Sequence, residues 1–224
     1  MDNNSPAAGC DLASGTQPMK ARKVRVPLLV SLLMFSSLVV AQTQEPPRII
    51  KEQNGKITNY RAEGSLASTQ AINCIPLAQA KRKFTPPDLY RSVADCLAKD
   101  EYESAAKLFA LAGIYARFDA ERVTDKTAGQ ARTVLIMNTL SNVPEEKKNK
   151  LNASLSRITK TPELLSALCE EVAQVGMPDY YPKYMILHGI KAFTGNPHDG
   201  ALVANFDATG TWKGLQSTYL HCPS

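Results

Sequence analysis

The clearest hydrophobic pattern lies in residues 88–117, where two helical periodicities follow one another. The first predicted helix spaces its apolar positions at i, i+4, i+7 and i+8, and these are Leu89, Val93, Cys96 and Leu97. The second keeps one face apolar and mostly small, with Tyr102, Ala105, Ala106, Phe109, Ala112, Gly113 and Ala116. Small residues let a neighbouring element approach closely. We therefore expect two helices joined by a tight turn, with the rest of the chain packed around them.

Further helical patterns continue along the chain, each bounded by proline, glycine or a capping residue. They predict helices over residues 75–84, 101–117, 120–141, 145–158, 162–175, 181–193 and 211–220, and a short strand over 201–206. Residues 134–137 are apolar all round, which predicts the deepest part of the core there. Thr161-Pro162 suits a helix start, and Gly176 suits a helix stop.

An N-terminal β-hairpin is predicted over residues 48–61. Asn54-Gly55 is a preferred pair for the two central positions of a type I′ turn, because both positions need positive φ. Residues 62–73 are small and polar, which is typical of a linker. With six or seven helices, one hairpin and no βαβ alternation, the sequence predicts a compact, mostly α fold.

The N-terminal segment carries the pattern of a secretory signal peptide. A basic patch of Lys20, Arg22, Lys23 and Arg25 precedes the apolar run 26–40, and small residues lead up to Ala41. We expect cleavage between Ala41 and Gln42, with Met19 as a possible true start. An uncleaved anchor is the alternative, although the run is shorter than the roughly 20 residues that span a bilayer. The predicted organisation is a signal peptide (1–41), a hairpin and linker (42–73) and a helical domain (74–224).

Cysteine usage agrees with export. Cys10 precedes the predicted cleavage site, and Cys74, Cys96, Cys169 and Cys222 follow it. An even count in an exported chain indicates two disulfides with three possible connectivities. We favour Cys74–Cys96 and Cys169–Cys222, because each pair ties an irregular segment to a nearby helix. Four buried thiols are the alternative, and a zinc site is disfavoured because no two of these cysteines have the usual short spacing.

Charge does not indicate a nucleic-acid partner. The net charge is +5, but basic and acidic residues are interspersed, and no basic stripe with interleaved aromatic residues is present. We expect contact with a membrane only transiently, through the signal peptide.

The second helix of the opening pair resembles helix B of a tetratricopeptide (TPR) or Sel1-like repeat. The family places an aromatic or Leu, Ala, an aromatic and Ala at offsets 0, 3, 7 and 10, which correspond here to Tyr102, Ala105, Phe109 and Ala112. Leu89 stands where the family has its first-helix Trp. The family's closing Pro falls on Arg117, and no second copy appears at the 34-residue period. The resemblance implies one TPR-like helical hairpin and, by analogy, protein binding.

The most unusual stretch for chemistry is residues 180–189. On the predicted helix, Tyr181, Tyr184 and His188 share a face, and Tyr180 directly precedes it. Aromatic side chains with polar tips line pockets or anchor interfaces, and the single tryptophan, Trp212, joins these candidate binding residues. The simpler interpretation is a buried face whose hydroxyl groups find backbone partners.

Two further arrangements raise a catalytic or metal-binding hypothesis. His198-Asp199 lies in a Gly- and Pro-rich loop, where a turn is the simpler explanation. His188, His198 and His221 could in principle hold zinc, but their spacing matches no zinc motif. No nucleophile elbow, phosphate loop or dinucleotide fingerprint is present. We therefore expect no catalytic residues, no metal and no cofactor.

These observations favour an exported, non-enzymatic protein that binds a protein partner, for example a periplasmic inhibitor or immunity-type protein. The candidate binding residues are Tyr180, Tyr181, Tyr184, His188, His198, Asp199 and Trp212. The alternatives are a metal- or His-dependent hydrolase and a structural component of an envelope complex.

Overall fold

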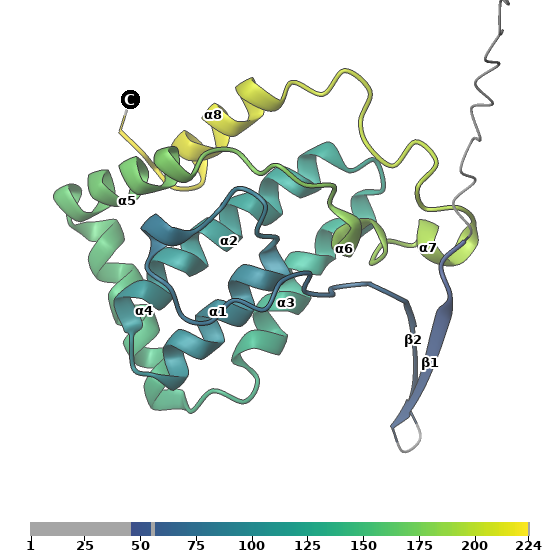
Figure 1. Ribbon diagram of the computed structural model, residues 1–224, viewed down its shortest axis with the longest axis horizontal. Coiled ribbons are helices and arrows are strands. Elements are labelled where there is room, and N and C mark those ends of the chain that lie inside the picture. The colour runs from purple at the N-terminus through teal and green to yellow at the C-terminus, as the bar shows by residue number, and fades with distance from the viewer. Residues whose placement is uncertain (1–45, 55–56, 224) are drawn as a thin grey trace, which may run out of the picture. The chain divides into compact units, whose positions relative to one another are not determined.

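The structure, a computed structural model, describes residues 46–54 and 57–223 (Figure 1). The predicted signal peptide, its cleavage site at Ala41 and the possible start at Met19 lie outside these residues. Within the described part, no helix is both long enough and apolar enough to cross a membrane.

The described chain is mostly helical, as the sequence predicts, with one small antiparallel hairpin. The elements in chain order are β1 (Ile49–Asn54), β2 (Ile57–Ala62), α1 (Pro86–Ala98), α2 (Tyr102–Arg122), α3 (Ala131–Leu140), α4 (Glu145–Lys160), α5 (Pro162–Val175), α6 (Lys183–Ile186), α7 (Lys191–Thr194) and α8 (Ala208–Thr218). Two short 3-10 helices, η1 (Leu77–Gln79) and η2 (Lys126–Gln130), interrupt the connections.

Helix α1 begins at a capping box. The backbone N–H and the hydroxyl of Thr85 both donate to Asp88 Oδ2 at 2.8 Å, and Pro86 and Pro87 occupy the first turn, where a missing N–H does no harm. The apolar residues predicted to face inward are buried in the core: Leu89, Val93, Cys96 and Leu97. The predicted pairing of α1 with α2 through a tight turn is confirmed (Figure 1).

Helix α2 is the central helix of the core. It packs against α1, α3, α4 and α8, and most of its length is buried. Its small face does allow close approach: a Cβ atom built on Gly113 would lie 2.0 Å from the hydroxyl oxygen of Tyr219. The helix continues to Arg122, five residues beyond the predicted end at Arg117, because Phe118 and Asp119 are both buried in helical conformation.

The prediction for residues 120–141 is wrong in two respects. A break at residues 123–130, mostly η2, separates α2 from a shorter α3. The apolar stretch 134–137 is not the deepest part of the core, because Met137 is 63% exposed and only Leu135 is buried. Helix α3 lies at the edge of the bundle, so only one of its faces is covered.

The predicted helix over 181–193 is also wrong, since two single-turn helices, α6 and α7, take its place. Asp125 contacts the chain between them and at the start of α7. Its Oδ2 accepts the backbone N–H of Lys191 at 3.0 Å, and it lies so close to Gly189 that an added Cβ would be 2.3 Å away. The chain bends here to place its backbone against Asp125.

The hairpin forms, with a register one residue different from the prediction. Asn54 pairs with Ile57, so Asn54 belongs to β1 and not to the centre of the turn. The base of the hairpin is anchored by a small buried cluster of Ala62, Leu187 and Ala192.

Two further segments have less regular secondary structure than predicted. Residues 75–84 form only the short η1. Their later part also bonds the chain after α5: Arg82 Nε donates to the Met177 carbonyl at 2.9 Å, and the Asp179 N–H donates to the Arg82 carbonyl at 3.0 Å. The predicted strand 201–206 is reduced to a single bridge between Leu202 and Val123.

Helix α5 confirms both of its predicted ends. It begins directly after Thr161, although the Thr161 side chain makes no capping hydrogen bond, and it stops at Gly176, whose φ of 84° favours glycine.

Both favoured disulfides are present. Cys74–Cys96 joins the segment before η1 to α1, with Cα atoms 4.6 Å apart, and Cys169–Cys222 joins α5 to the chain after α8, with Cα atoms 5.7 Å apart. The alternatives of four thiols or a cysteine zinc site are therefore wrong.

Candidate functional site

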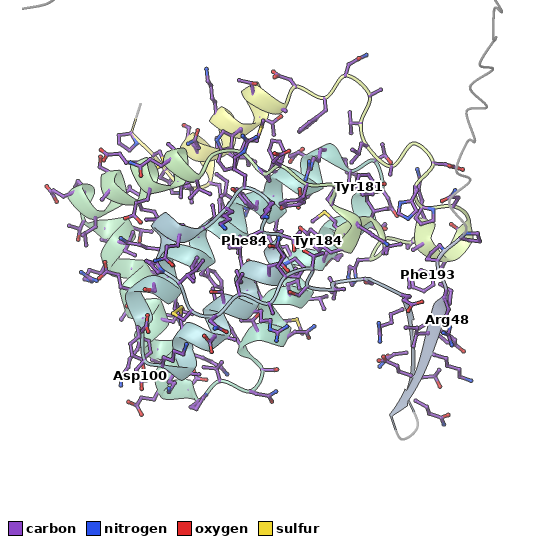
Figure 2. All side chains as sticks on the ribbon, viewed as in Figure 1. Arg48, Phe84, Asp100, Tyr181, Tyr184 and Phe193 are labelled. Atoms are coloured by element: carbon purple, nitrogen blue, oxygen red, sulfur yellow. A yellow bond between two sulfur atoms is a disulfide. The ribbon has the colours of Figure 1, made fainter. Side chains whose placement is uncertain are left out.

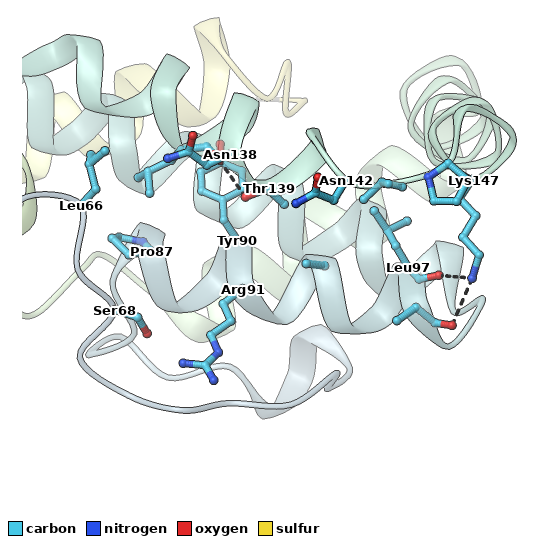
Figure 3. Close-up of a pocket in the computed structure, with 15 residues that line it drawn as sticks. Leu66, Ser68, Pro87, Tyr90, Arg91, Leu97, Asn138, Thr139, Asn142 and Lys147 are labelled. Atoms are coloured by element: carbon cyan, nitrogen blue, oxygen red, sulfur yellow. Dashed lines mark hydrogen bonds between the residues drawn. The ribbon is translucent and has the colours of Figure 1, made fainter. Parts of the chain in front are cut away.

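A groove of about 640 Å3 lies between α1 and α3, beside the start of α4 (Figure 3). Most of its lining is apolar, and this part consists of Leu66, Pro87, Tyr90, Ala94, Leu97, Ala98, Leu135, Val143 and Pro144. Asn138, Thr139 and Asn142 add amide and hydroxyl groups from α3 and the loop after it. An open, mainly apolar groove with a few polar groups suits the side chains of a peptide segment.

The charged groups at this groove are both cations. Lys147 is held by the chain itself, because its Nζ donates to the carbonyls of Leu97 and Ala98 at 2.7 and 3.1 Å and pairs with Asp100 at 3.0 Å. Arg91 is exposed and extends outward from α1 (Figure 3). None of the described lining residues is a carboxylate, so the groove favours an acidic group on whatever occupies it.

Asp88 fixes the wall of the groove that the predicted linker contributes. Its carboxylate accepts hydrogen bonds from Ser68 Oγ (2.6 Å), Thr69 N (2.6 Å), Thr69 Oγ1 (3.0 Å) and Gln70 N (2.9 Å), besides the two from Thr85. Burial raises the pKa of Asp88, but these hydrogen bonds outweigh burial and lower it below 3.8. Residues 63–73 lack regular secondary structure, yet the hydrogen bonds from Ser68, Thr69 and Gln70 attach them to α1.

The predicted tyrosine face is divided between the core and the surface. Tyr184 is buried, and its hydroxyl donates to Asp119 Oδ2 at 2.8 Å, while the hydroxyl of Tyr180 donates to the same oxygen at 3.0 Å. Asp119 is fully buried, and its Oδ1 pairs with Arg122 at 2.6 Å. Burial raises the pKa of Asp119, against the opposing effects of Arg122 and the two hydroxyls. Both carboxylate oxygens of Asp119 accept hydrogen bonds, and the carboxylate is buried from solvent, which indicates a structural role.

Tyr181 and His188 lie away from that network. Tyr181 is exposed (Figure 2). Its hydroxyl oxygen is 3.0 Å from His198 Nδ1, and the centres of the two rings are 5.9 Å apart. His188 instead contacts Ser65, with 3.1 Å between Nδ1 and Oγ. The expected common face of Tyr181, Tyr184 and His188 does not exist, because α6 ends before His188.

The remaining candidates do not form a catalytic group. Asp199 accepts a hydrogen bond from Asn196 at 3.2 Å, and His198 bonds Tyr181, so the adjacent pair is not a dyad. Burial lowers the pKa of His198, with Lys183 adding to the effect and Asp199 opposing it. Trp212 is a core residue that packs edge-on against Phe118.

Among the described residues, potential metal ligands gather in one group, Cys74, Cys96 and Glu101. The two sulfur atoms there are bonded to each other, so they have no thiolate to offer a metal. No histidine of the described chain belongs to a group of three potential ligands.

Sequence reasoning missed the groove and the anchoring role of Asp88. The Thr85-x-x-Asp88 spacing signals the capping box, but nothing local shows that Ser68, Thr69 and Gln70 also bind this carboxylate. Comparison of the chain with family models, curated proteins and solved structures finds no match.

Proposed function

We propose that this chain is an exported, non-enzymatic protein that binds a partner protein through the groove between α1 and α3. The observation that carries the proposal is the groove itself, about 640 Å3 with a mainly apolar lining. A TPR-like relationship of the α1–α2 pair agrees with this role, and two disulfides suit an oxidising compartment. A periplasmic inhibitor or immunity-type protein is one role of this kind.

The proposed occupant is a short segment of the partner with apolar side chains and at least one acidic group. The apolar part fills the space between Tyr90, Ala94 and Leu135, and the acidic group lies near Arg91. The tyrosine-rich segment 180–188 is not the proposed surface, because the hydroxyls of Tyr180 and Tyr184 donate hydrogen bonds to the buried Asp119.

Site-specific photo-crosslinking in the exporting cell tests the proposal. The crosslinking amino acid is placed at Ala98 or Asn138 in the groove, and at the exposed Ala153 on α4 as a control outside it. We expect one and the same partner protein from both groove positions and none from the control.

Purified partner and chain then provide the quantitative test. Ala94→Glu places a charge among the apolar lining residues, and Arg91→Glu reverses the charge at the rim, so both weaken binding by about tenfold or more. Lys160→Glu makes the same charge change at the end of α4 and leaves binding unchanged. Crosslinks that form equally from Ala153, or binding that survives Ala94→Glu, contradict the proposal.

A further inference from the structure

A small pocket of about 140 Å3 lies between α2, α4, α5 and the chain after α8. Among the described residues, it shares no lining residue with the groove between α1 and α3. Ala106 and Ala110 form its α2 side, and because each carries only a methyl group, α2 leaves space that a larger side chain would fill. The other apolar lining residues are Phe109, Leu155, Ile158, Leu168 and Leu220.

The surface of this pocket is almost entirely apolar. The hydroxyl of Thr159 donates within its own helix, to the carbonyls of Leu155 and Ser156 at 3.0 and 3.2 Å. The hydroxyl oxygen of Tyr219 lies against α2, where a Cβ built on Gly113 would be 2.0 Å away. Such a lining offers few hydrogen bonds, so it favours an uncharged apolar group over an ion, a sugar or a peptide backbone.

The C-terminal segment forms one wall of the pocket and is held in place beside it. Residues 219–221 line the pocket, and the next residue, Cys222, donates its N–H to the Gln216 carbonyl at 3.0 Å. The disulfide from Cys222 to Cys169 ties this wall covalently to α5. His221 and Thr159 are exposed lining residues, so the pocket is not sealed from solvent.

An empty apolar space of this size is unfavourable, because protein interiors are closely packed and each void costs stability. A cavity of about 150 Å3 lined by Leu, Ile and Phe stays free of water and binds benzene or xenon. The present pocket has nearly this volume and the same types of residue. We propose that it binds a small, uncharged apolar group of about six carbon atoms, such as a benzene ring or the end of a short alkyl chain. This site is independent of the proposed protein binding.

Thermal unfolding of the purified, disulfide-bonded chain with and without benzene tests the pocket. A ligand that binds only the folded state raises Tm, so we expect a rise for the wild type. Ala110→Leu fills the pocket from α2 and should lose this rise. Ala153→Leu makes the same change at an exposed position on α4 outside the pocket and should keep it. Leucine favours a helix nearly as well as alanine, so neither change disturbs the helix backbone.

Fluorine NMR of fluorobenzene measures binding directly, without unfolding the protein. We expect its resonance to broaden with the wild type and with Ala153→Leu, and the affinity to be at least about tenfold weaker for Ala110→Leu. If Ala110→Leu does not fold, Ile158→Ala provides the test, because it widens the pocket on the α4 side. This variant should bind the larger naphthalene more tightly than the wild type does.

Titration with 1-hexanol and hexanoate distinguishes two sources of the apolar group. Binding of benzene without these two indicates a free small molecule. Binding of 1-hexanol and hexanoate as well indicates the end of a longer chain, whose polar head stays near the exposed His221. Both results support the site. A wild type that binds neither benzene nor 1-hexanol, or equal responses of the wild type and Ala110→Leu, would overturn the proposal.

Discussion

The hydroxyl of Tyr184 donates a hydrogen bond of 2.8 Å to Asp119, although 65 residues separate the two along the chain. Asp119 is fully buried on α2, and the bond connects the central helix to the single turn of α6. Tyr184, Tyr180 and Arg122 together satisfy a carboxylate that would otherwise be strongly unfavourable inside the core. The segment that attracted attention for its chemistry therefore supports the fold.

Removing one donor to Asp119 should destabilise the protein measurably. We expect Tyr184→Phe to lower the free energy of unfolding by about 1.5–3 kcal/mol, because the lost hydrogen bond is made to a charged group. Urea unfolding monitored by circular dichroism measures the change. Tyr181→Phe removes an exposed hydroxyl from the neighbouring tyrosine and should change stability by less than about 0.5 kcal/mol. Equal effects of the two variants would contradict a structural role for the Asp119 network.

Asp88 should make stability depend on pH in the acid range. Its pKa is lower in the folded protein than the ordinary 3.8, so the folded state binds this proton less tightly than the unfolded state. The stabilisation is complete above the unfolded pKa and is lost as the pH falls through the folded pKa. We expect Asp88→Asn to lower stability by about 1.5–3 kcal/mol at pH 7.

The difference between Asp88→Asn and the wild type should be constant from pH 7 to about 5 and shrink below pH 3.8, in urea midpoints taken across that range. Ser68→Ala removes only one of the hydrogen-bond donors to Asp88, so we expect a smaller loss of stability with the same dependence on pH. A difference that does not change between pH 7 and 3 would exclude this account of Asp88.

Two glycines on helices should respond in opposite ways to alanine. Gly113→Ala adds a Cβ that would lie 2.0 Å from the Tyr219 hydroxyl oxygen and 3.0–3.2 Å from two of its ring carbons, so we expect this side chain to move away from Arg117. We expect net destabilisation, even though alanine favours a helix by about 1 kcal/mol over glycine. Gly214 on α8 has no atom within 4 Å of such a Cβ, and Gly214→Ala should stabilise. Thermal unfolding compares them, and a stabilised Gly113→Ala would show that α2 and Tyr219 are not in close contact.

The disulfides should contribute substantially to stability. Cys169–Cys222 spans 53 residues and Cys74–Cys96 spans 22, so the first restricts the unfolded chain more. We expect the paired Cys→Ala variants to lose about 2–5 kcal/mol each in denaturant titrations. Alkylation of the native, non-reduced protein followed by mass spectrometry is the direct check. Modification of any of these four cysteines would rule out the pairing.

Local sequence patterns determined the parts of this protein whose interactions are local. The α1–α2 pair, the proline starts, the stop at Gly176 and the mostly α class all depend on contacts within about four residues. The cysteine pairing was also predictable, because an even number of cysteines flanking helices leaves few arrangements.

Only the tertiary structure decided how the polar side chains are used. Periodicity predicted one helix over 181–193, but the structure has two single turns there, and Asp125, more than fifty residues earlier, accepts the backbone N–H of Lys191 at the start of the second. The same kind of distant pairing places Ser68 on Asp88 and Tyr184 on Asp119. A buried polar group is stable only where partners from distant segments converge, and no pattern within a single helix specifies that convergence.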